Sequence, residues 1–156
     1  MTFELVWRQR TVTAAQTPRT FLDFVLGGES LYERHAGDLI SCLGWLQPQA
    51  EAQAVRQLLG GAPPDADGRV AVQICPECAD RECGLLTVIL RHDGDDLLWS
   101  EPASSWFDSA ETRGWVHETR DFVAWPELRF DAAEYRRVLS GVLTRVAGGA
   151  AGEKFA

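Results

Sequence analysis

Short apolar runs bounded by turn residues predict several β-strands along the chain. The segments with this pattern are residues 3–8, 21–26, 69–74, 85–91 and 97–100. Asp93-Gly94 lies between the last two runs, and Asp-Gly in such a position is the strongest short-range hairpin signal in a sequence. We therefore expect a β-hairpin over residues 85–100 that turns at Asp93-Gly94 and places residues 90 and 97 opposite each other.

Residues 48–59 follow the period of a helix instead. Pro48 suits the first helical position, and Gly60-Gly61 suits the end of the helix. The apolar stripe between them consists of Ala50, Ala54, Val55, Leu58 and Leu59. A shorter piece over residues 30–36 follows a turn at Gly27-Gly28, and we expect it to be irregular or helical.

The last element is an amphipathic helix that begins after Asp131. Asp131 and Glu134 have the spacing of a capping box, with Asp in the place of Ser or Thr, and Phe130 can pack on Tyr135 as a hydrophobic staple. Gly148-Gly149 is expected to end the helix. Its apolar face is formed by Tyr135, Val138, Leu139, Val142, Leu143 and Val146.

The segment 104–125 is rich in aromatic residues but lacks a clear period, and we expect strands at 115–117 and 122–124 within it. The order of elements predicts an α+β fold, with a mainly antiparallel sheet, two or three helices and the C-terminal helix packed on the sheet. Because the loop 61–68 is too short for a domain linker, we expect one domain over residues 1–149, followed by a flexible tail at 150–156.

Composition and charge narrow the class of protein. The chain has 156 residues, of which 46% are hydrophobic and 24% charged, as in an ordinary globular domain. The formal net charge of −8 disfavours binding to nucleic acid or to an anionic membrane surface. The apolar runs are far shorter than the ~20 residues of a membrane-spanning helix, and residues 1–5 lack the features of a signal peptide. We expect a cytoplasmic protein.

The most specific chemical signal is the segment 75–84, Cys-Pro-Glu-Cys-Ala-Asp-Arg-Glu-Cys-Gly, which we call the cysteine knuckle. It holds three of the four cysteines of the chain, Cys75, Cys78 and Cys83. A Cys-x-x-Cys spacing lets two thiolates bind one tetrahedral metal ion at about 2.3 Å. Zinc holds thiolates together without redox chemistry. The spacing therefore predicts a structural zinc site at Cys75, Cys78 and Cys83.

A closed zinc site needs a fourth ligand, and the hairpin geometry tests the candidates. His92 lies along the strand at roughly 30 Å from Cys83, which is too far. The returning strand should place residue 104 opposite Cys83, so that residues 101–106 lie near the metal. No thiol or imidazole lies there, and Glu101 and Asp108 are only weaker oxygen donors. Cys42 is the favoured fourth ligand, because a set of four cysteines is a common structural site. His117 is the alternative.

Other roles for the knuckle stay open. The thiols can be free in a hydrogen-bonded turn, because cysteine also behaves as a small apolar residue. They can also take part in thiol–disulfide exchange. A thioredoxin-like motif has its Cys-x-x-Cys at the start of a helix, however, whereas Cys83-Gly84 and a strand follow here. Cysteine–histidine catalysis would need His35, His92 or His117 beside a thiol.

The knuckle, followed by Thr87 and Trp99, resembles a family of small uncharacterised bacterial proteins. That family carries Cys-Pro-x-Cys-Gly-Asp-x-x-Cys-Gly before a β-hairpin. Weaker likeness is found at residues 43–45 and at Phe130-Asp131, and Ala79 stands where the family usually has Gly. The resemblance implies a similar knuckle but no particular activity.

These observations favour a non-enzymatic, cytoplasmic domain that binds another protein and is stabilised by a zinc-type cysteine knuckle. The acidic and aromatic region 93–125 is the expected contact surface. One alternative is a thiol-redox or metal-dependent enzyme that uses the same cysteines, and a second is a zinc-containing nucleic-acid binder. A homodimer is left open.

Overall fold

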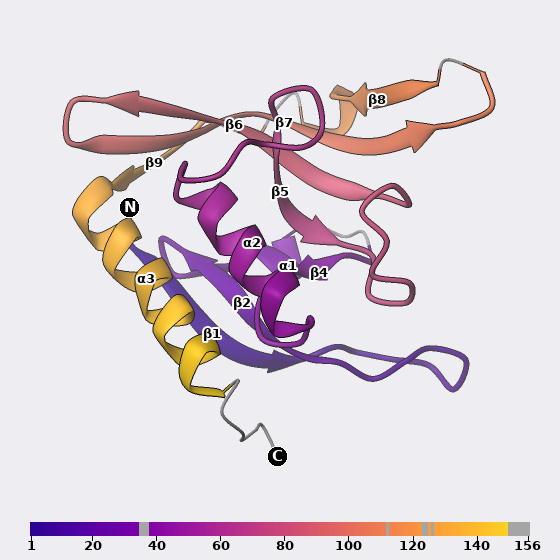
Figure 1. Cartoon of the computed structure of the whole chain (residues 1–156), viewed down its shortest axis with the longest axis horizontal. Helices are drawn as coiled ribbons and strands as arrows, with labels where there is room; N and C mark the ends of the chain where they lie inside the picture. Colours follow the sequence, from indigo (N-terminus) through magenta and orange to yellow (C-terminus); the bar gives the residue numbers. More distant parts are fainter. Residues whose placement is uncertain (35–37, 112, 123–124, 126, 150–156) are drawn as a thin grey trace.

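The computed structural model describes residues 1–34, 38–111, 113–122, 125 and 127–149. Within them the fold is α+β, as predicted, but the strands form two antiparallel sheets rather than one. The first sheet has the order β1-β2-β3 and the second the order β4-β5-β6-β7-β8, with β9 paired to β7. In Figure 1 strands β6, β7 and β8 lie at the top of the view and β1 and β2 at the bottom, while α2 lies near the centre and α3 runs along one side from β9 to β1.

The strands of the first sheet are β1 (Phe3–Gln9), β2 (Thr20–Leu26) and β3 (Glu29–Ser30). Those of the second sheet are β4 (Ile40–Ser41), β5 (Val70–Ile74), β6 (Leu85–Asp93), β7 (Asp96–Asp108), β8 (Gly114–Glu118) and β9 (Leu128–Asp131). The helices are α1 (Leu31–Arg34), α2 (Pro48–Leu58), α3 (Ala132–Gly149) and the short 3₁₀ helix η1 (Arg120–Phe122). The two strands expected at residues 85–91 and 97–100 are confirmed as parts of β6 and β7, which form the predicted hairpin.

The β6–β7 hairpin turns one residue later than the sequence suggests. Asp93 pairs with Asp96, so the turn residues are Gly94-Asp95, and a bulge between Thr87 and Ile89 shifts the register further. Leu90 therefore faces Trp99 rather than residue 97. Bulges add a residue to one strand and are not visible in the apolar pattern.

Helix α3 starts with the predicted cap. The backbone N–H of Glu134 donates to Oδ2 of Asp131 at 2.9 Å, and the rings of Phe130 and Tyr135 stack at 5.8 Å. Oε1 of Glu134 does not close the box, however. It accepts from the backbone N–H of Phe3 at 3.1 Å, which ties α3 to the start of β1.

The core is aromatic and lies where α3 meets both sheets. Its rings have centroid separations between 4.6 and 6.4 Å, and they belong to Phe3, Phe24, Trp99, Phe130 and Tyr135. All five side chains are buried. Because Trp99 and Phe130 come from the second sheet, the amphipathic helix packs on that sheet as predicted.

Two expectations near the second sheet have different outcomes. The strand at 115–117 is confirmed as part of β8. The prediction of a strand at 122–124 is wrong at Phe122. This residue is the last of η1, and its buried ring packs against Trp125. Val123, Ala124 and the predicted tail at 150–156 lie outside the described residues. Among the described residues, no helix combines the length and apolar character needed to cross a membrane.

Candidate metal centre

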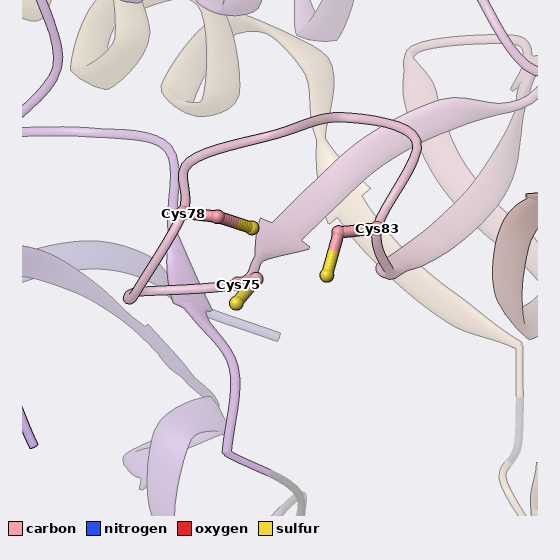
Figure 2. Close-up of side chains that lie close together, drawn as sticks. All are labelled: Cys75, Cys78 and Cys83. Atoms are coloured by element: carbon pink, nitrogen blue, oxygen red, sulfur yellow. The ribbon is translucent and has the colours of Figure 1, made fainter.

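The cysteine knuckle joins two neighbouring strands of the second sheet. Ile74 at the end of β5 pairs with Leu85 at the start of β6, so the chain leaves and re-enters the sheet at one place. The Sγ atoms of Cys75, Cys78 and Cys83 all lie within 4.8 Å of one another. Figure 2 shows the three side chains close together, with Cys75 and Cys83 at the two ends of the loop and Cys78 between them in sequence. The predicted site residues are therefore brought together, close enough for one metal ion to bind all three.

Backbone hydrogen bonds shape the loop around the sulfurs. The N–H of Ala79 donates to the carbonyl of Cys75 at 3.1 Å, and the N–H of Cys83 donates to the carbonyl of Asp80 at 3.1 Å. Oδ1 of Asp80 accepts from the N–H of Glu82 at 2.9 Å. Ala79 has φ of 55°, in the left-handed region that favours glycine. A glycine would adopt this backbone conformation with less strain than the alanine present here.

The three thiols influence one another's ionisation. Burial opposes ionisation of Cys75, but hydrogen bonds from the backbone N–H groups of Cys78 and Glu77 and from the other thiols lower its pKa below the ordinary value. Hydrogen bonding to Cys78, burial and the charge of Cys75 raise the pKa of Cys83 to about 12. Three thiolates at this spacing repel one another, and a divalent cation removes that repulsion.

One side of the knuckle is clamped by arginines from the chain that connects β1 and β2. The side chain of Arg10 is fully buried, and its guanidinium donates to Glu77, to Asp38 at 2.6 Å and to the carbonyl of Thr17 at 2.8 Å. Glu77 also accepts from the backbone N–H of Thr17 at 3.0 Å. Arg19 donates to the carbonyl of Pro76 at 2.9 Å. These bonds hold the first cysteine pair against the first sheet.

The opposite side of the knuckle is held by α2 and by β7. Nε of Arg81 donates to Asp65 at 2.6 Å, and its Nη2 donates to Oε1 of Gln57 in α2 at 3.1 Å. The carbonyl of Glu82 accepts from the N–H of Phe107 at 3.0 Å. The knuckle therefore contacts the connection between β1 and β2, helix α2 and strand β7, three parts of the fold that are distant in sequence.

Neither predicted fourth ligand joins the three sulfurs. Cys42 is buried in a cluster with Ile74 and Leu85, and the described sulfurs that lie within 4.8 Å of one another do not include it. Because Ser41 of β4 pairs with Gln73 in antiparallel register, the chain at Cys42 is already leading away from Cys75. The preference for Cys42 as a ligand is thus wrong for this structure. Cys42 fits the other interpretation considered for it, that of a small apolar residue.

The histidines are also placed elsewhere, as far as they are described. His117 pairs with Ser105, which pairs with Leu85, so two strand spacings or about 10 Å separate it from the start of β6. His92 is exposed near the hairpin tip, at the other end of β6 from Cys83. His35 lies outside the described residues. Of the weaker donors considered from sequence, Glu101 binds Arg91, and Oδ1 of Asp108 accepts from the N–H groups of Ala110 and Glu111.

A second polar cluster lies on β7 and β8, and the sequence did not reveal it. Ser105 Oγ lies 2.7 Å from Nδ1 of His117, whose Nε2 lies 2.9 Å from Oδ2 of Asp67. The residue types and distances resemble a nucleophile–base–acid chain. The exposure does not fit such a chain, however. Ser105, in the place of the nucleophile, is 1% exposed, whereas the Asp67 side chain, in the place of the acid, is 61% exposed. Ser105 also bonds Thr87 at 2.8 Å, so its hydroxyl serves the sheet and is inaccessible to a substrate.

No local signal marks this second cluster, because Asp67 and His117 are 50 residues apart and meet only through the sheet. Comparisons with protein families, with curated proteins and with solved structures found no match to this chain. Among the described residues, the cysteine knuckle is the cluster whose geometry fits a chemical role, that of a metal site.

Proposed function

We propose that this protein is a non-enzymatic, cytoplasmic domain that binds another protein and contains a structural zinc centre at Cys75, Cys78 and Cys83. The observation that carries the zinc centre is the convergence of three Sγ atoms within 4.8 Å of one another. Thiolates are soft ligands that suit Zn²⁺. The filled d shell of this ion imposes no preferred coordination geometry. Free thiols of this kind persist in a reducing compartment.

A structural role agrees with what the knuckle contacts. Its backbone and side chains receive bonds from Arg10 and Arg19 on one side and from Phe107 on the other. An ion at the sulfurs would fix the loop to which these residues bond. It would thereby hold the β1–β2 connection and strand β7 in place relative to each other. The resemblance to a bacterial family with the same knuckle belongs to this proposal, and the left-handed backbone of Ala79 supports it.

The zinc centre is tested by metal content. Protein purified without chelator should contain one zinc per chain by elemental analysis and native mass spectrometry. Cys75→Ser, Cys78→Ser and Cys83→Ser should each lose most of that zinc. Cys42→Ser is the matched control and should keep it, because Cys42 lies apart from the sulfur cluster. Zinc absent from the wild-type protein even after refolding with the metal would overturn the proposal.

The protein-binding part of the proposal rests on the β7–β8 hairpin. This hairpin extends from the body of the molecule (Figure 1), and Trp106 on β7 is 38% exposed. Exposed tryptophans are frequent anchors of protein interfaces. Glu111 is exposed on the same hairpin, and the chain carries a net charge of −8, so we propose a basic protein as the partner.

This part is tested with Trp106→Ala. A partner retained on immobilised wild-type protein should be lost from Trp106→Ala and should be released by salt. Trp7→Ala is the control, because Trp7 is 50% exposed but lies on β1. Equal retention by both variants would remove the hairpin from the proposal. A turnover that depends on Cys75, or salt-sensitive binding to nucleic acid, would favour the enzyme or the nucleic-acid alternative instead.

A further inference from the structure

We propose that the three-cysteine centre keeps its fourth coordination position open to solvent, and that this position takes an imidazole nitrogen from a histidine of a partner protein. The inference rests on the proposed zinc centre and goes beyond it. A purely structural zinc site is closed by four protein ligands, whereas an open position accepts a ligand from outside.

The sulfurs are accessible from solvent. Cys78 and Cys83 are exposed and Cys75 is half-buried, so the ion would sit at the surface rather than in the core. Among the described histidine, cysteine, aspartate and glutamate side chains, the group within metal-binding distance consists of these three thiols alone. The described part of the chain thus offers three ligands and an exposed face.

Three described candidates for a fourth ligand, His117, Cys42 and Glu77, are occupied by other contacts. Both ring nitrogens of His117 are within hydrogen-bond distance of Ser105 and Asp67. Cys42 is 1% exposed and packs in a buried cluster with Ile74 and Leu85. Glu77 belongs to the knuckle itself, but its carboxylate binds Arg10 and both the N–H and the hydroxyl of Thr17. Recruiting any of the three would break contacts that hold the fold.

The negative charge of the metal centre and its loop favours a neutral fourth ligand. A zinc ion with three thiolates carries a net charge of −1, and the same loop bears the exposed carboxylates of Asp80 and Glu82. A fourth thiolate or a carboxylate would add negative charge to an already acidic loop. Neutral imidazole adds none, and three cysteines with one histidine is an established zinc ligand set. A histidine of the partner therefore fits the position better than an acidic or thiolate donor.

The position can be probed with cobalt in place of zinc in the full-length protein. Co²⁺ bound to thiolates gives charge-transfer bands, and its d–d bands report the ligand set. We expect imidazole to shift the d–d bands in a saturable titration while the charge-transfer bands persist. Acetate at the same ionic strength is the control and should leave the spectrum unchanged. A spectrum that imidazole does not alter, with cobalt bound stoichiometrically, would overturn the open position and leave the metal centre intact.

Variants decide whether the chain closes the site itself. His35→Ala, His92→Ala, His117→Ala and Cys42→Ser should each show the wild-type cobalt spectrum before imidazole is added. A changed spectrum in any one of them would identify an internal fourth ligand and refute the inference, while the three-cysteine centre would stand. Failure of cobalt and zinc to bind at all would overturn both proposals together.

Discussion

The guanidinium of Arg10 is buried against the carboxylate of Glu77, which lies 67 residues further along the chain. Glu77 stands between Cys75 and Cys78, so this pair joins the end of the first strand to the cysteine knuckle. The Arg10 side chain is 0% exposed, whereas those of Glu77 and Asp38 are 41% and 53% exposed. The buried cation thus depends on two carboxylates that keep contact with water.

Replacing Arg10 should destabilise the fold. Arg10→Ala removes hydrogen bonds to Glu77, Asp38 and the carbonyl of Thr17. We expect the free energy of unfolding to fall by about 2–3 kcal/mol, since bonds to charged groups are stronger than neutral ones but the partners are partly hydrated. Urea denaturation measures the change. Arg120→Ala is the control, because Arg120 pairs with Glu118 while 86% exposed, and it should be without measurable effect. Equal effects of the two variants would contradict this role for Arg10.

Ala79→Gly should stabilise the protein. Ala79 has φ of 55°, where an L-residue with a Cβ is strained and glycine is not. Allowing for the greater freedom of glycine in the unfolded chain, we expect a gain of about 0.5–1 kcal/mol. Ala147→Gly on the exposed side of α3 is the matched control and should lose about 1 kcal/mol, because its backbone is helical. Loss of stability in both variants would show that Ala79 is not strained.

Local signals were sufficient for the elements that carry their own pattern. The cap at Asp131 and the Phe130–Tyr135 staple involve neighbours in sequence, and both appear in the structure. The sulfur cluster was also predictable, because Ile74 and Leu85 bring the two ends of a short loop together. The division of the strands into two sheets was not, since it depends on which faces meet in the core.

The parts of the site that could not be predicted are set by long-range contacts. The bulge between Thr87 and Ile89 moves the partner of Leu85 to Ser105, and no pattern announces it. The preference for Cys42 failed because its position depends on the register of β4 against β5. The Arg10–Glu77 pair has no sequence signature at all, because an arginine in a loop is usually exposed.

The hydroxyl of Tyr135 should contribute measurably to stability. It donates to the carbonyl of Leu58 at 2.7 Å and accepts from Nε1 of Trp99 at 3.2 Å, and all of these groups are buried. Tyr135→Phe leaves both partners without a bond, which should cost about 1–3 kcal/mol. Tyr32→Phe is the control, because its hydroxyl accepts from the N–H of Thr11 at an exposed site. Thermal unfolding compares the two, and a larger loss in Tyr32→Phe would contradict the assignment.

Cys42 should resist alkylation in the folded protein. Burial raises its pKa to about 11, above the ordinary thiol value, so at pH 8 the thiol stays protonated. The contribution of this thiol to stability is complete below the unfolded pKa of roughly 8.5 and is lost as the pH rises through the folded value. In metal-free protein, iodoacetamide at pH 8 followed by peptide mass spectrometry should modify the exposed Cys78 and spare Cys42 until urea unfolds the chain. Early modification of Cys42 would show that the cluster around Ile74 opens.

Metal removal should lower stability through the knuckle alone. A ligand that binds only the folded state stabilises it, and each tenfold fall in free zinc above the dissociation constant should cost about 1.4 kcal/mol. A graded series of zinc-buffered solutions, with the unfolding midpoint measured in each, tests this dependence in the wild-type protein. In Cys83→Ser the midpoint should be lower and independent of zinc, because one of the three clustered thiols is missing. Cys42→Ser should keep the wild-type slope even if its midpoint falls, since losing a buried thiol affects packing and not metal binding. The same zinc dependence in Cys83→Ser as in wild type would mean that zinc acts at another place on the chain.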